Sequence, residues 1–423
     1  MVKVKEARAR YLTNVNEEQT ASEKNVSPGG YMSTEVGMVP NDWSVKPIGG
    51  VLSIRHGRSQ KEIVCIDGIY PVLGTGGEID RTNIPLYSKP SVLIGRKGTI
   101  NKPRFIDTPF WTVDTLFYSE INVVNDAKFI FYKFCLIDWM SYNEASGVPS
   151  LNASTIENIP LSFPINKSEQ TAIAKALSDI DTLIISLEKL ITKKQAIKTT
   201  TMQQLLTGKK RLLGFGEGKG YKQTELGEIP EDWTCVKLVD MAELGTGNTP
   251  PTMDSSNYGS DYLFVSPSDL GWHKWVKDTD KKLSLKGFNL SRKFPANSIL
   301  FTCIGSTIGK IGIASFELTS NQQINAVFPN GSCNSEYIYY SLDYAVPRIK
   351  ILAGNQAVPI INKTEFGETL IPLPKINAEQ TAIANVLSVM DSEIDLLENR
   401  LNKTQQIKQG MMQELLTGRT RLI

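Results

Sequence analysis

The sequence has 423 residues, of which 41% are hydrophobic, as is typical of a globular protein with two or three domains. Its 46 Lys and Arg residues almost balance 44 Asp and Glu residues, so the net charge of +2 favours no class of partner. No stretch is apolar over the length needed to span a bilayer, and the five cysteines lack a Cys-x-x-Cys spacing. These features argue against a membrane protein and a disulfide scaffold, and they predict a cytoplasmic protein with reduced thiols.

The chain contains two copies of one unit. Residues 30–43 recur as residues 220–233, and residues 169–181 recur as residues 379–391. The interval between these matched segments is about twenty residues longer in the second copy, and within it the two copies stop resembling each other. A period this long indicates a duplicated domain rather than a solenoid repeat. We therefore expect a shared frame that carries two different interiors.

The first copy begins after residues 1–29, for which we expect a short helix over residues 4–12 and a polar linker. Residues 30–165 are predicted to form an α+β domain, because short strand-like runs alternate with Gly and Pro turns. The turn 95–104 contains no acidic residue and holds four candidate DNA contacts, Arg96, Lys97, Lys102 and Arg104. It is either a solvated basic loop or a loop that approaches phosphates and base edges, where Arg can bind guanine through two hydrogen bonds.

Residues 166–208 are predicted to form one long helix, because residues 168–206 contain neither Pro nor Gly. Apolar residues recur there with heptad spacing, at Ile173, Leu177, Ile180, Ile184, Leu187 and Ile191. Further apolar residues widen this seam to one side, which indicates more than one partner surface, at Leu183, Leu190 and Ile197. We expect Asn166 or Ser168 to cap the helix and Gly208 to end it.

Residues 209–229 are predicted to be a linker, with a flexible Gly-rich hinge at residues 214–220 that follows a helix and not a cofactor-binding strand. Residues 230–375 are predicted to form the second α+β domain. In residues 273–293 basic residues outnumber acidic ones, and Trp272 and Trp275 accompany them, which suits a nucleic-acid face, although Trp272 could equally be a partly buried anchor. The candidate DNA contacts of this domain, including amides that can pair with adenine, are Lys274, Ser306, Lys310, Gln322 and Gln323.

Residues 376–418 are predicted to form a second long helix, followed by a short tail at residues 419–423. It repeats the heptad seam with Ile383, Leu387, Met390, Ile394, Leu397 and Leu401. We expect Asn377 to cap this helix and Gly418 to end it. The matching seams favour an antiparallel coiled coil of the two helices about a pseudo-two-fold axis, and the alternative is two unrelated bundles. Forty helical residues form a rod of roughly 60 Å.

Residues suited to catalysis are scarce. The two histidines, His56 and His273, are too few for a histidine metal cluster. The run 305–310 contains a Gly-Lys pair without the spacing of a P-loop, and the chain has no Asn-Pro-Pro-aromatic motif of an amino-methyltransferase. We therefore expect a non-catalytic chain that binds neither a metal nor a cofactor itself.

The repeated motifs resemble a known family. The order Gly-Tyr-x-x-Thr-Glu-x-Gly-x-x-Pro-x-Asp-Trp, a variable interior, then Glu-Gln-x-x-Ile-Ala-x-x-Leu-Ser-x-x-Asp and Leu-Leu-Thr-Gly, occurs twice over residues 30–423. It resembles the specificity subunit of type I restriction-modification systems. The resemblance implies that each interior is a target recognition domain that reads one half of a bipartite DNA sequence, and that the helices are a spacer that docks two methyltransferase subunits.

The resemblance also has implications for the target and the partners. The two interiors resemble different branches of recognition domains, which implies an asymmetric target. The implied partners are double-stranded DNA, two adenine methyltransferase subunits that use S-adenosylmethionine, and restriction subunits that use ATP and magnesium. Two other classes of function stay open at this point: a non-catalytic coiled-coil scaffold that binds proteins, and an enzyme in its own right.

Overall fold

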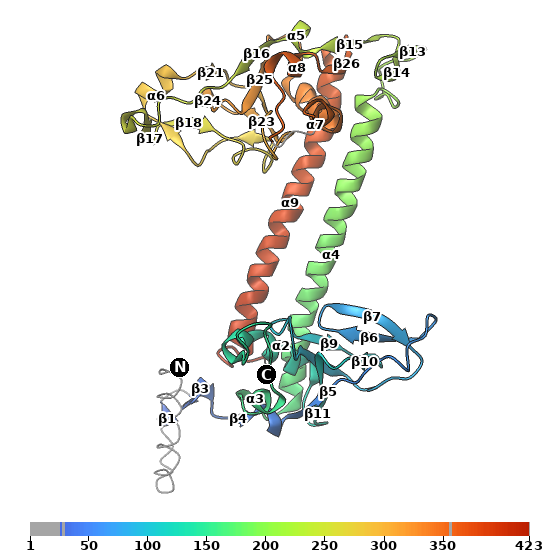
Figure 1. Cartoon of the computed structure of the whole chain (residues 1–423), viewed down its shortest axis with the longest axis vertical. Helices are drawn as coiled ribbons and strands as arrows, with labels where there is room; N and C mark the ends of the chain where they lie inside the picture. Colours follow the sequence, from blue (N-terminus) through green and yellow to red (C-terminus); the bar gives the residue numbers. More distant parts are fainter. Residues whose placement is uncertain (1–25, 28–29, 355–357, 423) are drawn as a thin grey trace. The chain divides into compact units, whose positions relative to one another are not determined.

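The computed structural model describes residues 26–27, 30–354 and 358–422, so the helix expected at residues 4–12 lies outside the described residues. The chain forms two compact units. Unit 1 comprises residues 1–186 and 400–423, and unit 2 comprises residues 187–399. Each unit therefore combines one predicted domain with parts of both long helices (Figure 1). The α+β class is confirmed, and none of the described helices is long and apolar enough to cross a membrane.

The interior of unit 1 is built on two small sheets, and a third sheet with the order β1-β2-β3 precedes it along the chain. A four-stranded sheet has the order β5-β11-β8-β9, a three-stranded sheet has the order β10-β6-β7, and β12 pairs antiparallel with β4. The strands are β1 (Val26–Ser27), β2 (Tyr31–Thr34), β3 (Gly37–Pro40), β4 (Trp43–Pro47), β5 (Leu52–His56), β6 (Tyr70–Gly74), β7 (Gly77–Thr82), β8 (Ser91–Gly95), β9 (Arg104–Ile106), β10 (Trp111–Thr112), β11 (Leu116–Ile121) and β12 (Pro160–Pro164). The helices are η1 (Ile48–Gly50), α2 (Ala127–Leu136), η2 (Trp139–Tyr142) and α3 (Ala153–Glu157).

Strand β8 shows how the layers of unit 1 arise from its sequence. All five of its residues are buried, because successive side chains of a strand point to opposite faces and both faces of β8 are covered. Val92 and Ile94 pack in the cluster that contains α2, whereas Leu93 packs with Phe110 and Leu116 in a separate cluster. A buried apolar run that ends at Gly95 therefore presents the following basic turn at the edge of a rigid core.

Unit 2 repeats this plan with more strands. Its sheets have the orders β16-β25-β22-β23-β19 and β17-β20-β18-β24-β21, and β15 pairs antiparallel with β26. The strands are β13 (Tyr221–Thr224), β14 (Gly227–Pro230), β15 (Trp233–Lys237), β16 (Glu243–Thr246), β17 (Tyr258–Gly259), β18 (Tyr262–Val265), β19 (Trp275–Val276), β20 (Lys282–Leu283), β21 (Lys293–Phe294), β22 (Ile299–Thr302), β23 (Ile311–Ala314), β24 (Leu318–Ser320), β25 (Ile324–Phe328) and β26 (Leu370–Pro374). The helices are α5 (Leu238–Met241), η3 (Ser255–Asn257), α6 (Leu285–Leu290), α7 (Ser335–Leu352) and α8 (Lys363–Gly367).

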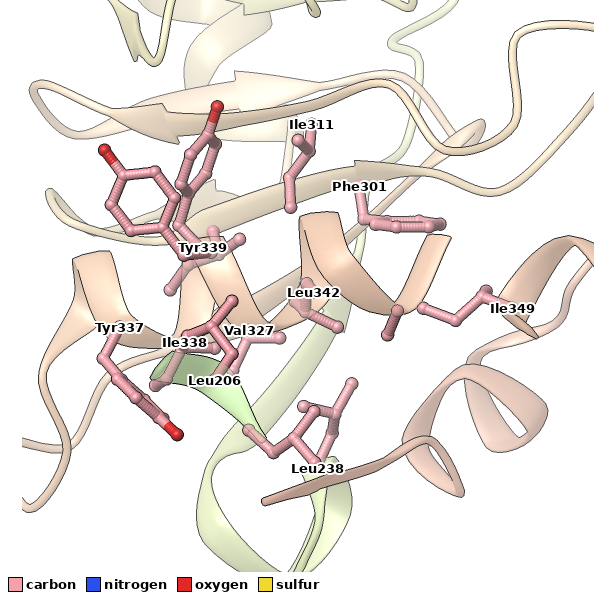
Figure 2. Packing of buried hydrophobic residues seen from close by; sticks show 14 of the residues in the cluster. Leu206, Leu238, Phe301, Ile311, Val327, Tyr337, Ile338, Tyr339, Leu342 and Ile349 are labelled. Carbon is pink, nitrogen blue, oxygen red and sulfur yellow. The ribbon is translucent and has the colours of Figure 1, made fainter. Parts of the chain in front are cut away.

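The main core of unit 2 lies between α7 and the first of these sheets. Helix α7 presents Ile338, Leu342 and Ile349, all at most 1% exposed, at helical spacing. Figure 2 shows these side chains on the helix below Phe301 and Ile311, which come from the strands above it. As in β8, alternate residues of β22 pack in two different hydrophobic clusters, since Leu300 lies in a different cluster from Phe301.

The two domains share one topology despite their divergent sequences. The order β5-β11-β8-β9 in unit 1 corresponds to β16-β25-β22-β23 in unit 2, and the parallel pair β6/β10 corresponds to β18/β24. The extra residues of the second copy lie mainly between β18 and β22, where β20 pairs with β18 as β7 pairs with β6, and β19, α6 and β21 are additional. The frame predicted from the repeat therefore extends through the interiors, and the insertion enlarges the outer sheet.

The long helices are α4 (Lys167–Leu206) and α9 (Asn377–Leu415). Within unit 2 they run antiparallel, because Lys194 pairs with Glu393 at 2.6 Å and Lys198 pairs with Asp391 at 2.5 Å. Seven predicted seam residues are buried, namely Ile173, Leu177, Leu187, Ile191, Ile383, Leu387 and Ile394. The others are half-buried, namely Ile180, Ile184, Met390, Leu397 and Leu401. The three residues that widen the seam, Leu183, Leu190 and Ile197, are exposed.

The helix ends confirm most of the predicted signals. Asn166 Oδ1 accepts a hydrogen bond from the Ser168 amide at 3.0 Å, so Asn166 caps α4. Gly208 and Gly418 end the helices with φ of +70° and +76°, a conformation that favours glycine. The prediction that Asn377 caps α9 was wrong, because Asn377 is already helical and the Glu379 amide donates to the Ile376 carbonyl.

The predicted linker, residues 209–229, is more ordered than we expected. It contains β13 and most of β14, which form an antiparallel hairpin. This hairpin corresponds to β2 and β3, which stand at the start of the first copy. The Tyr221 hydroxyl donates to the Gly208 carbonyl at 3.2 Å, and the Tyr31 hydroxyl donates to the Gly418 carbonyl at 3.0 Å. Each hairpin therefore packs on the end of a long helix.

Candidate nucleic-acid interface

Three backbone hydrogen bonds hold the basic turn of the first domain. The Arg96 amide donates to the Thr115 carbonyl at 2.8 Å, and the Gly98 amide donates to the Pro149 carbonyl at 2.8 Å. On the other side of the turn, the Leu151 amide donates to the Arg96 carbonyl at 2.9 Å. Segments that are distant in the sequence therefore fix the backbone, while the Lys97 side chain is exposed.

The second domain repeats the same three hydrogen bonds with different residues. The Cys303 amide donates to the Gln323 carbonyl at 2.8 Å, and the Gly305 amide donates to the Pro359 carbonyl at 2.9 Å. The Ile361 amide donates to the Cys303 carbonyl at 2.9 Å. Arg96 and Cys303 therefore occupy equivalent positions in a common loop frame. The side chains on that frame differ, so the two domains present different chemistry on one backbone.

The four basic candidates of the first domain do not share one turn. Arg96 and Lys97 follow β8, with Arg96 Nη1 donating to the Asp114 carbonyl at 3.2 Å, and Lys102 is exposed. Arg104, in contrast, is the first residue of β9, and its guanidinium donates to the Gly74 carbonyl. Burial lowers the pKa of Arg104 from its ordinary value. Arg104 is thus engaged by its own domain, which corrects our placement of all four residues in a single turn.

The polar candidates of the second domain lie on two loops of the common frame. Ser306 and Gln322 are exposed, and Gln322 Oε1 accepts a hydrogen bond from Thr249 Oγ1 at 2.7 Å. Gln323 Oε1 accepts from Asn321 Nδ2 at 3.0 Å. The Gln323 carbonyl binds the Cys303 amide, so the structure brings the 303–310 loop and the 321–323 loop together. These hydrogen bonds orient the amide side chains before any ligand is bound.

Two lysine candidates of this domain are held by neighbouring groups. Lys310 is half-buried, with Nζ 3.2 Å from the Pro267 carbonyl and 5.6 Å from the centroid of the Trp272 ring. Lys274 is only 13% exposed, and its ammonium binds Glu336 at 2.5 Å and Ser388 at 2.6 Å. Lys274 therefore joins α7 to α9, and its binding by Glu336 argues against its assignment as a DNA contact.

The basic window of the second domain carries less free charge than its composition suggests. Lys282 pairs with Asp278 at 2.8 Å, and Lys286 pairs with Asp254 at 2.7 Å. The Lys293 ammonium lies 4.7 Å from the centroid of the Phe288 ring. Trp272 is 76% exposed, so it is a surface residue and not a buried anchor. Spacing along the chain could not reveal the pairing of Lys286, because Asp254 lies outside the window.

A duplicated cluster of three residues, which we call a joint, connects each domain to both long helices. In the first joint Tyr132 donates to Asp181 at 2.6 Å, and Lys408 binds the other oxygen of Asp181 at 2.6 Å. The second joint repeats this arrangement with Tyr340, Asp391 and Lys198, with two contacts of 2.5 Å. Burial, with the carboxylate acceptor, raises the pKa of both tyrosines above their ordinary value. Our sequence prediction missed the joints, although the repeated Asp of the helix motif was a visible signal.

A second duplicated cluster, which we call a clamp, secures the helix starts. Arg421 binds Glu169 through Nε at 2.5 Å and Asp42 through Nη2 at 2.6 Å. In the other clamp Arg211 binds Glu379 at 2.6 Å and Asp232 at 2.9 Å. The Glu169 and Glu379 side chains are 4% and 2% exposed, so each arginine neutralises a buried carboxylate. The first Glu of the repeated helix motif is therefore structural.

In the described part of the chain, no group of three or more His, Cys, Asp or Glu residues is placed to hold a metal ion.

The chain matches the family model for the type I restriction modification DNA specificity domain over residues 40–199 and 230–407. These two matches cover more than half of the chain, with one match in each copy of the repeat. The chain therefore belongs to the family of type I restriction-modification specificity subunits.

Individual relatives agree with this assignment. The putative type I restriction enzyme MjaX specificity subunit of Methanocaldococcus jannaschii is 28% identical over 279 residues, which is 64% of this chain and 62% of that protein. This match spans less than two thirds of that relative. The MjaVIII specificity subunit of the same organism is 26% identical over 432 residues, covering 91% of this chain and 94% of that protein.

Solved structures show the same fold. The crystal structure of the type I restriction-modification S subunit from M. genitalium superposes with a TM-score of 0.63 at 17% identity, covering 88% of this chain and 96% of that chain. A structure described as the basis of complex assembly and conformational transition of the type I system gives a TM-score of 0.54 at 14% identity, covering 90% and 99% of the two chains.

Proposed function

We propose that this chain is the DNA-reading subunit of a type I restriction-modification complex and that each domain recognises one half of an asymmetric, bipartite target. The observation that carries this proposal is the common loop frame with different side chains. At equivalent positions of this frame, the first domain has Arg96 and Lys97, whereas the second has Cys303 and Ile304. Base sequence is read by side chains at base edges, so one frame with two sets of side chains suits two different half-sites.

The proposed division of labour leaves the chemistry to partners. Adenine methylation needs a base turned out of the duplex into a catalytic pocket, and we assign that pocket to methyltransferase subunits that use S-adenosylmethionine. Restriction subunits that use ATP and magnesium would complete the complex. This chain would act as the non-catalytic subunit that selects the sequence.

The long helices supply a surface for those partners. On α4, Leu183, Leu190 and Ile197 are 38%, 38% and 41% exposed and lie one heptad apart. On α9, Val389 and Leu396, also one heptad apart, are 69% and 70% exposed. A second apolar strip at heptad spacing, left free by the packing of the helices, favours the docking of a partner helix. We propose that two methyltransferase subunits dock along these helices.

The test is the adenine methylation map of the host genome with the gene for this chain intact and deleted. We expect deletion to erase one asymmetric bipartite motif. Replacing residues 31–160 by the recognition domain of another family member should then change one half of that motif only. A map that is unchanged by deletion would contradict the proposed function and favour a protein-binding scaffold. A change of both halves in the chimera would contradict the assignment of one half-site to each domain.

A further inference from the structure

We propose that Val148 and Val358 are equivalent specificity residues, each of which contacts the 5-methyl group of a thymine in its own half-site. This inference rests on the proposed function, because it concerns the same DNA-reading surface. Val148 is 67% exposed and Val358 is 56% exposed. A single exposed valine is ordinary on a protein surface. Two exposed valines at the same position of a common frame, in domains whose interiors otherwise diverge, need a further explanation.

The loop frame fixes the equivalence of these two residues. Val148 directly precedes Pro149, whose carbonyl accepts the Gly98 amide, and Val358 directly precedes Pro359, whose carbonyl accepts the Gly305 amide. Beyond each proline the backbone pairing continues, since Lys97 forms an isolated β-bridge with Ser150, and Ile304 forms one with Ile360. Each valine is therefore held next to the turn that follows the central buried strand of its domain.

The loop around Val148 is ordered by its own hydrogen bonds. Asn143 Oδ1 accepts from the Ala145 amide at 3.1 Å and from the Ser150 amide at 2.9 Å, and Asn143 Nδ2 donates to the Ala145 carbonyl at 2.8 Å. One side chain thus closes the loop from both ends. An ordered loop holds an apolar contact at a defined place, so that little conformational entropy is lost when a ligand binds.

The basic turn beside Val148 suits DNA as the ligand, although Glu144 of the Val148 loop lines the same hollow as Arg96 and Lys97. Arg96 and Lys97 lie on the turn that pairs with the Val148 loop, and within residues 95–104 there is no acidic residue. Cations of this kind attract phosphates, which position a protein on the duplex without reading its sequence. An apolar side chain among them would contribute information of its own, since thymine alone presents a methyl group in the major groove. The second domain offers the same valine beside polar side chains such as Ser306 and Gln322.

The experiment uses the full chain, purified with its partner subunits, and a duplex that contains the motif from the methylation map. Each thymine of the duplex is replaced in turn by uracil, which lacks only the 5-methyl group. We expect binding to weaken about fourfold at one position in each half-site, the value for one methyl contact. Val148→Thr, which keeps the shape but replaces one methyl group by a hydroxyl, should reduce the sensitivity to uracil in the first half-site only. Val358→Thr should do so in the second half-site only.

Two variants serve as controls. Val148→Ile keeps an apolar contact and should retain the sensitivity to uracil. Val124→Thr changes another valine of the first domain, 65% exposed on the loop between β11 and α2, and should leave the uracil profile unchanged. The complex could bind the motif while the valine variants show the same sensitivity to uracil as the wild type, or a half-site could contain no thymine. In either case the inference is wrong while the proposed function stands. If Val148→Thr instead weakens assembly with the partner subunits, the valine is a protein contact, and the inference is again wrong. Failure of the complex to bind any motif would overturn the proposed function itself.

Discussion

Lys198 and Asp391 form an ion pair of 2.5 Å between α4 and α9, and Asp391 also accepts a hydrogen bond from the Tyr340 hydroxyl. The same relationship recurs between Lys408 and Asp181 at 2.6 Å. Each aspartate thus connects a recognition domain to both long helices. Because the side chains of Lys198 and Asp391 are 20% and 18% exposed, solvent screens this contact less than an ordinary surface pair.

Removing the tyrosine hydroxyl from a joint should lower stability. A hydrogen bond to a charged group contributes about 1.5 to 3 kcal/mol, and Tyr340→Phe leaves the half-buried Asp391 with one partner fewer. We expect a decrease of that size in the free energy of unfolding, measured by denaturant titration of the complex or the chain. Tyr344→Phe, on the same helix, is the control, because the described structure records no hydrogen bond for its hydroxyl. Equal stability of the two variants would show that the joint contributes nothing.

Loss of a clamp arginine should be more costly. Arg421→Met leaves Glu169, which is 4% exposed, without its cation, and we expect a loss of about 3 kcal/mol. The double variant Arg421→Met with Glu169→Gln should recover part of this loss, because the buried charge is gone. The Arg421 guanidinium lowers the pKa of Asp42 from 3.8. A depressed folded pKa stabilises the fold above that value and not below it, so the deficit of Arg421→Met should shrink as the pH falls. A deficit that grows on acidification would contradict this assignment.

Lys133 should make stability depend on alkaline pH. It is 6% exposed, with Nζ 2.9 Å from the Leu416 carbonyl, and burial lowers its pKa from 10.5 to about 8. Between these values the unfolded chain holds a proton that the folded chain has released, so stability should rise with pH, by up to about 1.4 kcal/mol per unit. Lys133→Met should remove this rise in denaturation curves collected from pH 7 to 10. A rise of the same size in the variant would assign it to other groups.

The basic turn should act through phosphates or through bases, and salt distinguishes the two. If Lys97 contacts a phosphate, Lys97→Ala should reduce the slope of log affinity against log salt by about 0.9 and weaken all sequences alike. If Arg96 reads a base, Arg96→Ala should cost about 1 to 3 kcal/mol and relax one position of the motif. Lys175→Ala removes the same charge from a helix residue that is 74% exposed and should change neither quantity. Unchanged affinity and slope would remove a residue from the interface.

The long helices should set the gap between the two half-sites. Inserting four helical residues near Gln195 lengthens α4 by about 6 Å and rotates the residues C-terminal to the insertion about the helix axis. Two domains read one duplex from the same side only if their spacing matches the helical repeat, so the unspecified gap in the motif should lengthen. Methylation mapping of cells that carry the insertion would measure the gap. A functional variant with an unchanged gap would rule out the spacer role.

Features that depend on nearby residues could be predicted from the sequence. The heptad seams and the terminal Gly208 and Gly418 located both long helices to within a few residues, and the absence of Pro and Gly over residues 168–206 also marked the first. The repeat also located the two domains. The predicted capping residue of α9 was wrong because capping depends on which backbone amides remain unpaired. Here the Glu379 amide donates a hydrogen bond to the Ile376 carbonyl.

The sequence by itself determined the duplication, the helices and the two α+β interiors, because periodicity and turn residues act over a few positions along the chain. Only the tertiary structure decided which basic residues are free. Lys274 is bound by Glu336, 62 positions away, and Arg104 by Gly74, 30 positions away. It also decided that Arg421 donates a hydrogen bond to Asp42, 379 positions away, and that both domains share one loop frame. Such contacts form between segments brought together by folding, so no local pattern announces them.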